Sequence, residues 1–410
     1  MKKQSYTPNA KTLAKYADLI VRFGLQTQSG KAPKKGSVIQ FTVPEVAKPL
    51  YFHLQAAILK NGHHPLGNFI PSSDETYTFE RNFYTNASKD QLEFIPTKYH
   101  KALIDQIDAT IYVVAETNTH ELDGISGEKV MSRSKVMRPI KDLKFKKIDA
   151  GKLSWTIVMY GTDQTAAEAG MSSKVFWDQI IKACYLDHKN PVAEWHRIDR
   201  TVSKTAKKLT EMLIKELHWS GKDIDLTVGI GKDRTWRAGG GNNIPSYEVF
   251  TSPNFREVNG WIRFNQPHYK YNKRIEDIEL WFENGKVVKS KATKNHDLLK
   301  SMLKTEGGNQ LGEISLTDSR LSRITKPTGE ILYDENMGGR YGNTHVAIGF
   351  SFHDCYKGDG AKFTKKQWRD LGFNDSIVHS DFVSTTNRTV TATLYDGSEV
   401  VIYKDGKFTI

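Results

Sequence analysis

The sequence predicts an α/β first half with a mostly parallel sheet and an α+β second half with an antiparallel sheet. Short β-rich runs alternate with helical patterns before Asn190, which is typical of a parallel sheet. Later in the chain, Asn284-Gly285 and Asp396-Gly397 separate β-rich runs as hairpin turns do. The 410 residues are too many for one ordinary domain. We therefore expect domains over 1–190 and 191–410, with the boundary near Asn190-Pro191.

The elements expected in the first half follow from hydrophobic spacing. Leu13, Ala17 and Ile20 recur at helical spacing and Gly24 stops the run, so a helix is expected over 13–21. The other elements expected, in chain order, are a strand over 37–43, a helix over 45–61, a helix around 101–107, strands over 110–115 and 155–160, and a helix around 175–181.

In the second half the periodicity changes from helical to strand-like. A long helix is expected over 199–217, because Val202, Leu209 and Leu217 would share one face. Residues 281–288 predict a hairpin that turns at Asn284-Gly285. The remaining expected elements are consecutive antiparallel strands over 389–395 and 399–403, with Asp-Gly turns at 396–397 and 405–406.

Composition excludes several classes of protein. Hydrophobic residues make up 38% and charged residues 26%, as in soluble globular chains, and no apolar run approaches the ~20 residues of a membrane span. The net charge of +12 raises nucleic-acid binding as an alternative, but no known nucleic-acid motif accompanies it, so we expect no nucleic-acid partner. No apolar signal segment follows Met1. Because only two cysteines occur, a reducing cytoplasmic location is expected.

Two polar side chains within the apolar run 377–383 are candidate functional residues. Residues two apart in an extended strand point to the same face, so His379 and Asp381 can address one point. The simpler interpretation is a satisfied pair near a strand end. The apolar neighbours favour a functional role, because a buried carboxylate or imidazole is costly unless it is paired or bound to metal.

Three further polar residues lie in similar apolar settings: His345, Glu313 and Glu248. His345 could simply be a core histidine bonded to a carbonyl, and each glutamate could lie on the exposed face of a strand. A buried glutamate, in contrast, would require a cation. Three carboxylates and two histidines suit Zn²⁺, Co²⁺ or Mn²⁺. The spacing alone leaves open whether the five side chains converge.

Several motifs occur in a characteristic order along the second half. They are Asn-Ile-Pro-Ser-Tyr-Glu-Val-Phe-Thr-Ser-Pro at 243–253, Leu-Gly-Glu at 311–313, Leu-Tyr-Asp-Glu-Asn at 332–336, His-Val-Ala-Ile-Gly at 345–349 and His-Ser-Asp-Phe at 379–382. This series resembles the thermophilic-type metalloaminopeptidases, the AmpS, AmpT and PepS group. The first half matches that family only in general pattern.

The resemblance implies a hydrolase with two co-catalytic divalent ions (Zn, Co or Mn) in the antiparallel half. It implies peptide substrates with a free N-terminus and a homodimer. By the same resemblance Glu313 serves as the base, and it can also bridge the ions. The implied metal ligands are Glu248, Glu313, His345, His379 and Asp381.

One position departs from the family pattern. Phe352 stands where relatives typically have a tyrosine whose hydroxyl stabilises the tetrahedral intermediate. Losing one oxyanion donor typically costs ~10²–10³-fold in rate. Either Tyr356 or His353 substitutes, or metal polarisation suffices, or the activity is weakened. The alternative function is therefore a non-catalytic peptide- or metal-binding relative of the same fold.

Overall fold

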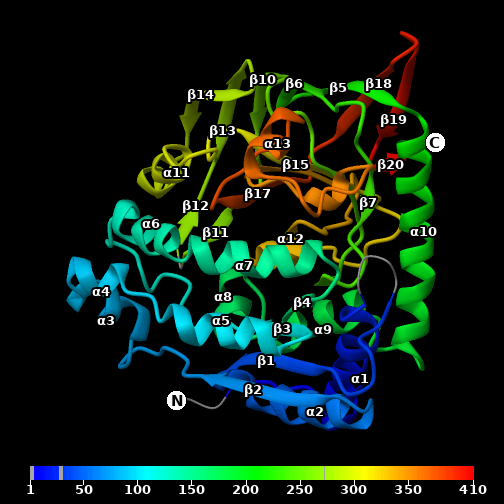
Figure 1. Ribbon diagram of the computed structural model, residues 1–410. Coiled ribbons are helices and arrows are strands. Elements are labelled where there is room, and N and C mark those ends of the chain that lie inside the picture. The colour runs from blue at the N-terminus through cyan, green and yellow to red at the C-terminus, as the bar shows by residue number, and fades with distance from the viewer. Residues whose placement is uncertain (1–3, 27–30, 272) are drawn as a thin grey trace.

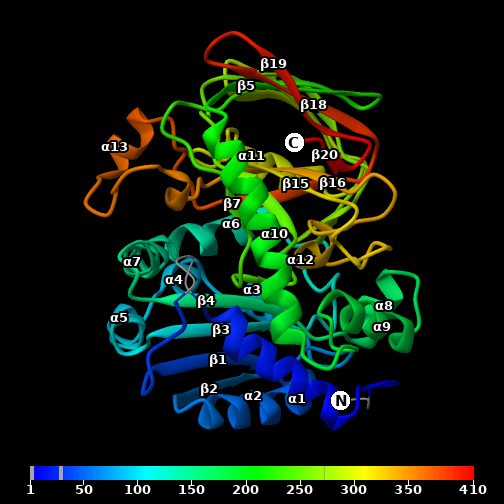
Figure 2. The same ribbon diagram turned by 90° about the vertical axis from the view of Figure 1, so that its right-hand side faces the viewer.

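The computed structural model describes residues 4–26, 31–271 and 273–410, and they form two stacked parts (Figure 1). The part nearer the N-terminus is built on a parallel sheet, and the other part contains antiparallel sheets. Helix α10, Pro191–Glu211, runs alongside both parts (Figure 2). Among the described residues, none of the helices combines the length and the apolar character needed to cross a bilayer.

The parallel sheet of the first half has the strand order β2-β1-β3-β4-β8. Every pair of neighbours in it is parallel. Its strands are β1 Val38–Pro44, β2 His64–Ile70, β3 Ala109–Val114, β4 Ser154–Met159 and β8 Asn243–Ile244. The predicted strands correspond to β1, β3 and β4. Strand β8, in contrast, comes from the second half of the chain and extends the sheet beside β4, which the sequence did not indicate.

Helices precede the first of these strands and connect the others, as the alternating pattern predicted. They are α1 Ala10–Leu19, α2 Lys48–Lys60, α3 Phe79–Asn86, α4 Lys89–Glu93, α5 Thr97–Gln106, α6 Gly127–Val136, α7 Arg138–Asp149, α8 Asp163–Glu168 and α9 Ser173–Ala183. The first helix continues as a π-helical turn over Ile20–Gly24. The Asn9 side chain caps the start of α1 by accepting a hydrogen bond from the Thr12 amide.

Two larger antiparallel sheets make up most of the second half. One has the strand order β14-β13-β10-β6-β5-β18-β19-β20, and the other has the order β17-β16-β15-β9-β7. The first contains β5 Ile214–Gly221, β6 Ile224–Gly229, β10 Val258–Arg263, β13 Glu279–Glu283, β14 Lys286–Lys291, β18 Arg388–Leu394, β19 Glu399–Lys404 and β20 Lys407–Phe408. The second contains β7 Arg237–Ala238, β9 Glu248–Thr251, β15 Leu311–Thr317, β16 Asn343–Gly349 and β17 His379–Ser384. A small ladder pairs β11 His268–Lys270 with β12 Lys273–Ile275, and the helices are α11 His296–Leu303, α12 Ile331–Asp334 and α13 Lys365–Asp370.

The predicted hairpins are present. Asn284 and Gly285 have φ of 48° and 79° between β13 and β14, which is the positive-φ pair that a two-residue hairpin turn requires. The predicted fold class is therefore confirmed.

The predicted helix over 199–217 is wrong at both ends. Helix α10 begins at Pro191, where the Asn190 side chain caps it, and ends at Glu211. Leu213 has φ of 53°, and the chain then turns into β5, where Leu217 is buried as a strand residue. An apolar residue at 217 fits the spacing of a helix and also that of a strand. Periodicity alone therefore assigned Leu217 to the wrong element.

Helix α7 lies at the junction of the two parts (Figure 1). Arg138 at its start pairs with Asp375, and Phe145 packs against Phe350 with ring centroids 4.7 Å apart. At its end Asp149 lies 3.1 Å from His353 Nδ1. These contacts attach the first half to the segment that connects β16 to β17.

Candidate metal centre

The register of one antiparallel sheet places five polar side chains on the same face. Residues directly opposite each other share a face, and Glu313 is opposite Ala347, which is opposite Asp381. His345 and His379 lie two residues from members of this row, so they share that face too. Glu248 reaches the same face through its pairing with Thr317. Neighbouring strands β9, β15, β16 and β17 thus bring together every residue that the sequence predicted as a ligand.

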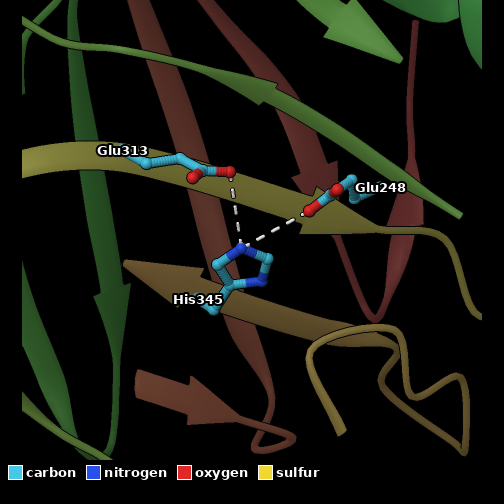
Figure 3. A group of neighbouring side chains, drawn as sticks. All are labelled: Glu248, Glu313 and His345. Carbon is cyan, nitrogen blue, oxygen red and sulfur yellow. Dashed lines mark ion pairs between the residues drawn. The ribbon is translucent and has the colours of Figure 1, made fainter. Parts of the chain in front are cut away.

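The five side chains form two groups of three that share Glu313. In each group the candidate ligand atoms all lie within 4.8 Å of one another. In the first group, the Nε2 atom of His345 lies 3.5 Å from Glu248 Oε2 and 3.7 Å from Glu313 Oε1 (Figure 3). In the second group, the Nε2 atom of His379 lies 3.2 Å from Glu313 Oε2 and 3.4 Å from Asp381 Oδ1. The two carboxylate oxygens of Glu313 therefore face different histidines.

Neighbouring groups orient these side chains. Ser246 and Ser315 donate hydrogen bonds to the two carboxylate oxygens of Glu248, at 3.1 and 3.3 Å. His379 Nδ1 lies 2.9 Å from the backbone carbonyl of Phe350. A proton on Nδ1 would be donated to that carbonyl, which leaves the Nε2 lone pair directed at the carboxylates. This arrangement is typical of metal-binding histidines.

The charges of the centre fit a divalent cation. Burial and the nearby Glu313 raise the pKa of Glu248 to about 7. Burial disfavours a charged His379, but Asp381 and Glu313 outweigh it and raise the pKa of His379 to about 10. Burial also opposes ionisation of Asp381, yet His379 holds the pKa of Asp381 below its usual range. Positive charge is therefore favoured here, and either protons on the histidines or metal ions can supply it.

A glycine positions Glu313 within its strand. The ladder between β15 and β16 has an irregularity between Leu311 and Glu313, at Gly312. A Cβ on Gly312 would lie 2.2 Å from the carbonyl oxygen of Phe350, which is too close for any side chain. The close approach of the two backbones therefore requires glycine beside the shared carboxylate.

Phe352 lies beside the centre. Its ring is 4.9 Å from the ring of His379 in an edge-to-face arrangement. It also lines a cleft of about 1410 Å³, to which Trp368 contributes. His353 stacks on Trp368 at 4.0 Å and pairs with Asp149, and the Tyr356 ring packs 5.6 Å from Trp368. The His353 ring is therefore already engaged outside the centre.

Glu335 is a candidate site residue for which the sequence predicted no role of its own. It is buried directly after α12 and accepts a hydrogen bond from Asn243 Nδ2 at 2.9 Å. Burial, followed by Glu248 and Asp381, raises the pKa of Glu335 well above its usual value. This carboxylate therefore belongs to the electrostatic surroundings of the centre. The only sequence feature that could have identified Glu335 is its position within the Asp-Glu-Asn motif.

Neighbouring strands place carboxylates and imidazoles on one buried face of a sheet. This arrangement defines a metal-dependent class of protein, and sequence comparison supports the assignment. The model of the thermophilic metalloprotease family (M29) matches residues 9–408. Aminopeptidase PepS of Streptococcus thermophilus is 26% identical over 98% of this chain and 99% of its own. Aminopeptidase AmpS of Bacillus subtilis is 29% identical, covering 73% of this chain and 76% of its own.

A solved structure shows the same fold. Wild-type AmpT from Thermus thermophilus superposes with a TM-score of 0.80 at 24% sequence identity, covering 97% of this chain and 99% of that one. The chain belongs to the thermophilic metalloprotease family M29, a family of metal-dependent peptidases. The resemblance seen in the sequence motifs is thereby confirmed.

Proposed function

We propose that the chain is an aminopeptidase that removes N-terminal residues from peptides at a centre of two divalent ions. The observation that carries the proposal is the position of Glu313 between His345 and His379, because it makes one carboxylate common to both groups of ligands. The relatives PepS and AmpS are named aminopeptidases, which supports the same activity. Zn²⁺, Co²⁺ and Mn²⁺ all suit the donor set.

In this proposal Glu248 and His345 would hold one ion, His379 and Asp381 would hold the other, and Glu313, which is common to both groups, would contribute to each. When bound, paired divalent ions polarise the scissile carbonyl and lower the pKa of a coordinated water. Glu313 is the catalytic residue that accepts the proton of the attacking water and returns it to the leaving amine. Ser246 and Ser315 keep Glu248 oriented throughout.

The second candidate function is a binding protein of the same fold, and Phe352 is the observation that favours it. Its ring lies beside His379 and carries no hydroxyl that could donate to a developing oxyanion. We favour the enzyme, because the complete donor set is present and polarisation by metal can act without that hydroxyl.

We further propose a cytoplasmic homodimer. Both cysteines, Cys184 and Cys355, are buried and free, as suits a reducing compartment. The dimer is proposed from the family resemblance, and light scattering of the purified protein would measure it.

The test is an assay of N-terminal residue release. We expect leucine release from leucyl peptides to stop after chelation and to return when Zn²⁺, Co²⁺ or Mn²⁺ is restored. N-acetylated peptides should remain intact, because an exopeptidase requires the free amine. Elemental analysis should find two ions per chain. Metal binding without amino-acid release from any peptide would support the binding protein instead.

A further inference from the structure

Two lysines from different elements reach the free edge of β17, beside the metal centre. Strand β17 lies at the end of its sheet and carries His379 and Asp381. Lys270 of β11 donates a hydrogen bond to the carbonyl of His379 at 3.0 Å. Lys141 of α7 donates to the carbonyl of Ile377 at 3.1 Å. One lysine comes from each half of the chain.

These two ammonium groups bind backbone carbonyls that are two residues apart in the chain. The carbonyl of Val378 accepts a hydrogen bond from Phe350 and so points toward β16. The carbonyls that bind the two lysines lie two residues apart, at the bend of Ile377 and at His379, the first residue of β17. Lys141 and Lys270 are therefore close enough to repel each other. Burial, followed by this repulsion, lowers the pKa of Lys141 to about 8.

The two ammonium groups form no close ion pair within the described residues, although Asp142 partly offsets the charge of Lys141. No carboxylate there lies within 4.0 Å of either ammonium nitrogen, whereas nearby Asp142 pairs with Arg138 and Lys365. Lys270 also acts on the metal centre, since it lowers the pKa of Asp381. Two neighbouring ammonium groups that keep contact with solvent attract an anion.

Each ammonium group has donors left for such an anion. A lysine ammonium carries three N–H donors, and each lysine here makes one hydrogen bond to the described protein. A carboxylate can accept one hydrogen bond from each lysine at once. A peptide whose N-terminus lies at the metal centre could extend across the edge of β17 and place a carboxylate there.

We propose that Lys141 and Lys270 form a subsite for a substrate carboxylate, so that the enzyme prefers short peptides with a free C-terminus. The inference rests on the proposed aminopeptidase function. The simpler explanation is that the lysines only cover the unpaired edge of β17, since lysines commonly protect strand edges. The two explanations differ in whether a peptide carboxylate affects binding.

The experiment compares peptides that differ only in the carboxylate. Leucyl-glycine, leucyl-diglycine and leucyl-triglycine are each assayed against the C-terminal amide, with metal restored. We expect kcat/KM to favour the free acid by about 10-fold at the length that reaches the pair. Lys141→Met should bring this ratio close to one, and Lys141→Arg should preserve it. Leucyl-glutamyl amide tests whether the subsite also accepts a side-chain carboxylate. A kcat/KM above that of leucyl-glutaminyl amide would support the subsite.

A matched control and a measurement without turnover complete the test. Lys146→Met changes an exposed lysine of the same helix and should leave the ratio unchanged. Calorimetry with N-acetyl-leucyl-glycine and its amide measures carboxylate binding without hydrolysis. Two results would overturn the subsite. One is equal binding of the acid and the amide by the unmodified protein. The other is a preference for the acid that persists in Lys141→Met at full metal content. Failure to release leucine from any substrate would count against the proposed function instead, because the binding preference does not require catalysis.

Discussion

Asp381 is the carboxylate on the edge strand of the centre, with its Oδ1 3.4 Å from His379 Nε2. Replacing it by asparagine keeps the shape of the side chain but removes a negative charge that a cation requires. We expect Asp381→Asn to weaken metal binding at the second group of ligands by about 10–100-fold or more. Competition with a metallochromic chelator would measure the affinity. Asp370→Asn, in an exposed residue of α13, is the control and should bind metal normally.

Phe352 gives a second prediction for a single residue. Because its ring lies beside His379 and lines the cleft, a hydroxyl added there would be placed near the reacting carbonyl. We expect Phe352→Tyr to raise kcat about 10–100-fold, and to raise it more than it lowers KM, since an oxyanion donor acts most strongly in the transition state. Steady-state kinetics on a leucyl peptide measures both constants. An unchanged kcat with structure and metal content intact would show that the hydroxyl is not the missing element.

Some of the site could be predicted from single residues and some could not. The common face of His379 and Asp381 follows from the two-residue period of a strand, and β17 has that geometry. For Glu248 and Glu313 an exposed strand face was the simpler expectation, whereas both are buried. Their burial depends on which strands become neighbours, and single-sequence spacing contains no information about that pairing.

Among the elements, the irregularity in β15 determines where Glu313 lies. We expect Gly312→Ala to push β15 away from Phe350, because the added methyl would lie 2.2 Å from that backbone carbonyl. The shift should lower both the melting temperature and the metal content per chain. Gly151→Ala is the control: its φ of 64° costs about 1 kcal/mol, but nothing lies within 4 Å of the new methyl. A Gly312→Ala protein that binds metal as tightly as the unmodified chain would contradict this role.

Two elements show the limits of periodicity. The end of α10 was misplaced because the apolar residues of β5 continue its spacing, and only the left-handed backbone at Leu213 marks the change. Strand β8 has two residues, too few for any period, and it joins the parallel sheet by long-range pairing with Ile157 and Val158. The longer elements β1, β3, β4 and α9 were predicted within a few residues, because each buries a regular apolar pattern.

At the scale of the whole molecule, a carboxyl group of the first half acts on one of the second half. Glu116 follows β3 of the first half, and Glu330 precedes α12 of the second half. Burial, then Glu116 and Asp334, raise the pKa of Glu330 to about 8. Burial, then Glu80 and Glu121, raise the pKa of Glu116 to about 7. Ionisation of Glu330 is therefore opposed first by its burial and then by Glu116 of the other half.

The raised pKa of Glu330 predicts how stability depends on pH. A carboxyl whose pKa is raised by folding keeps its proton in the folded chain after the unfolded chain has lost it. Its destabilising effect is thus small below about pH 4.5, grows as pH rises, and is complete above about pH 8. We expect Glu330→Gln to raise the melting temperature by about 1–3 °C at pH 8.5 and by less at pH 5, measured by scanning calorimetry. Glu399→Gln, in an exposed strand residue, should show no such difference between the two pH values. If Glu330→Gln has the same effect at both pH values, the charge of Glu330 does not destabilise the folded chain.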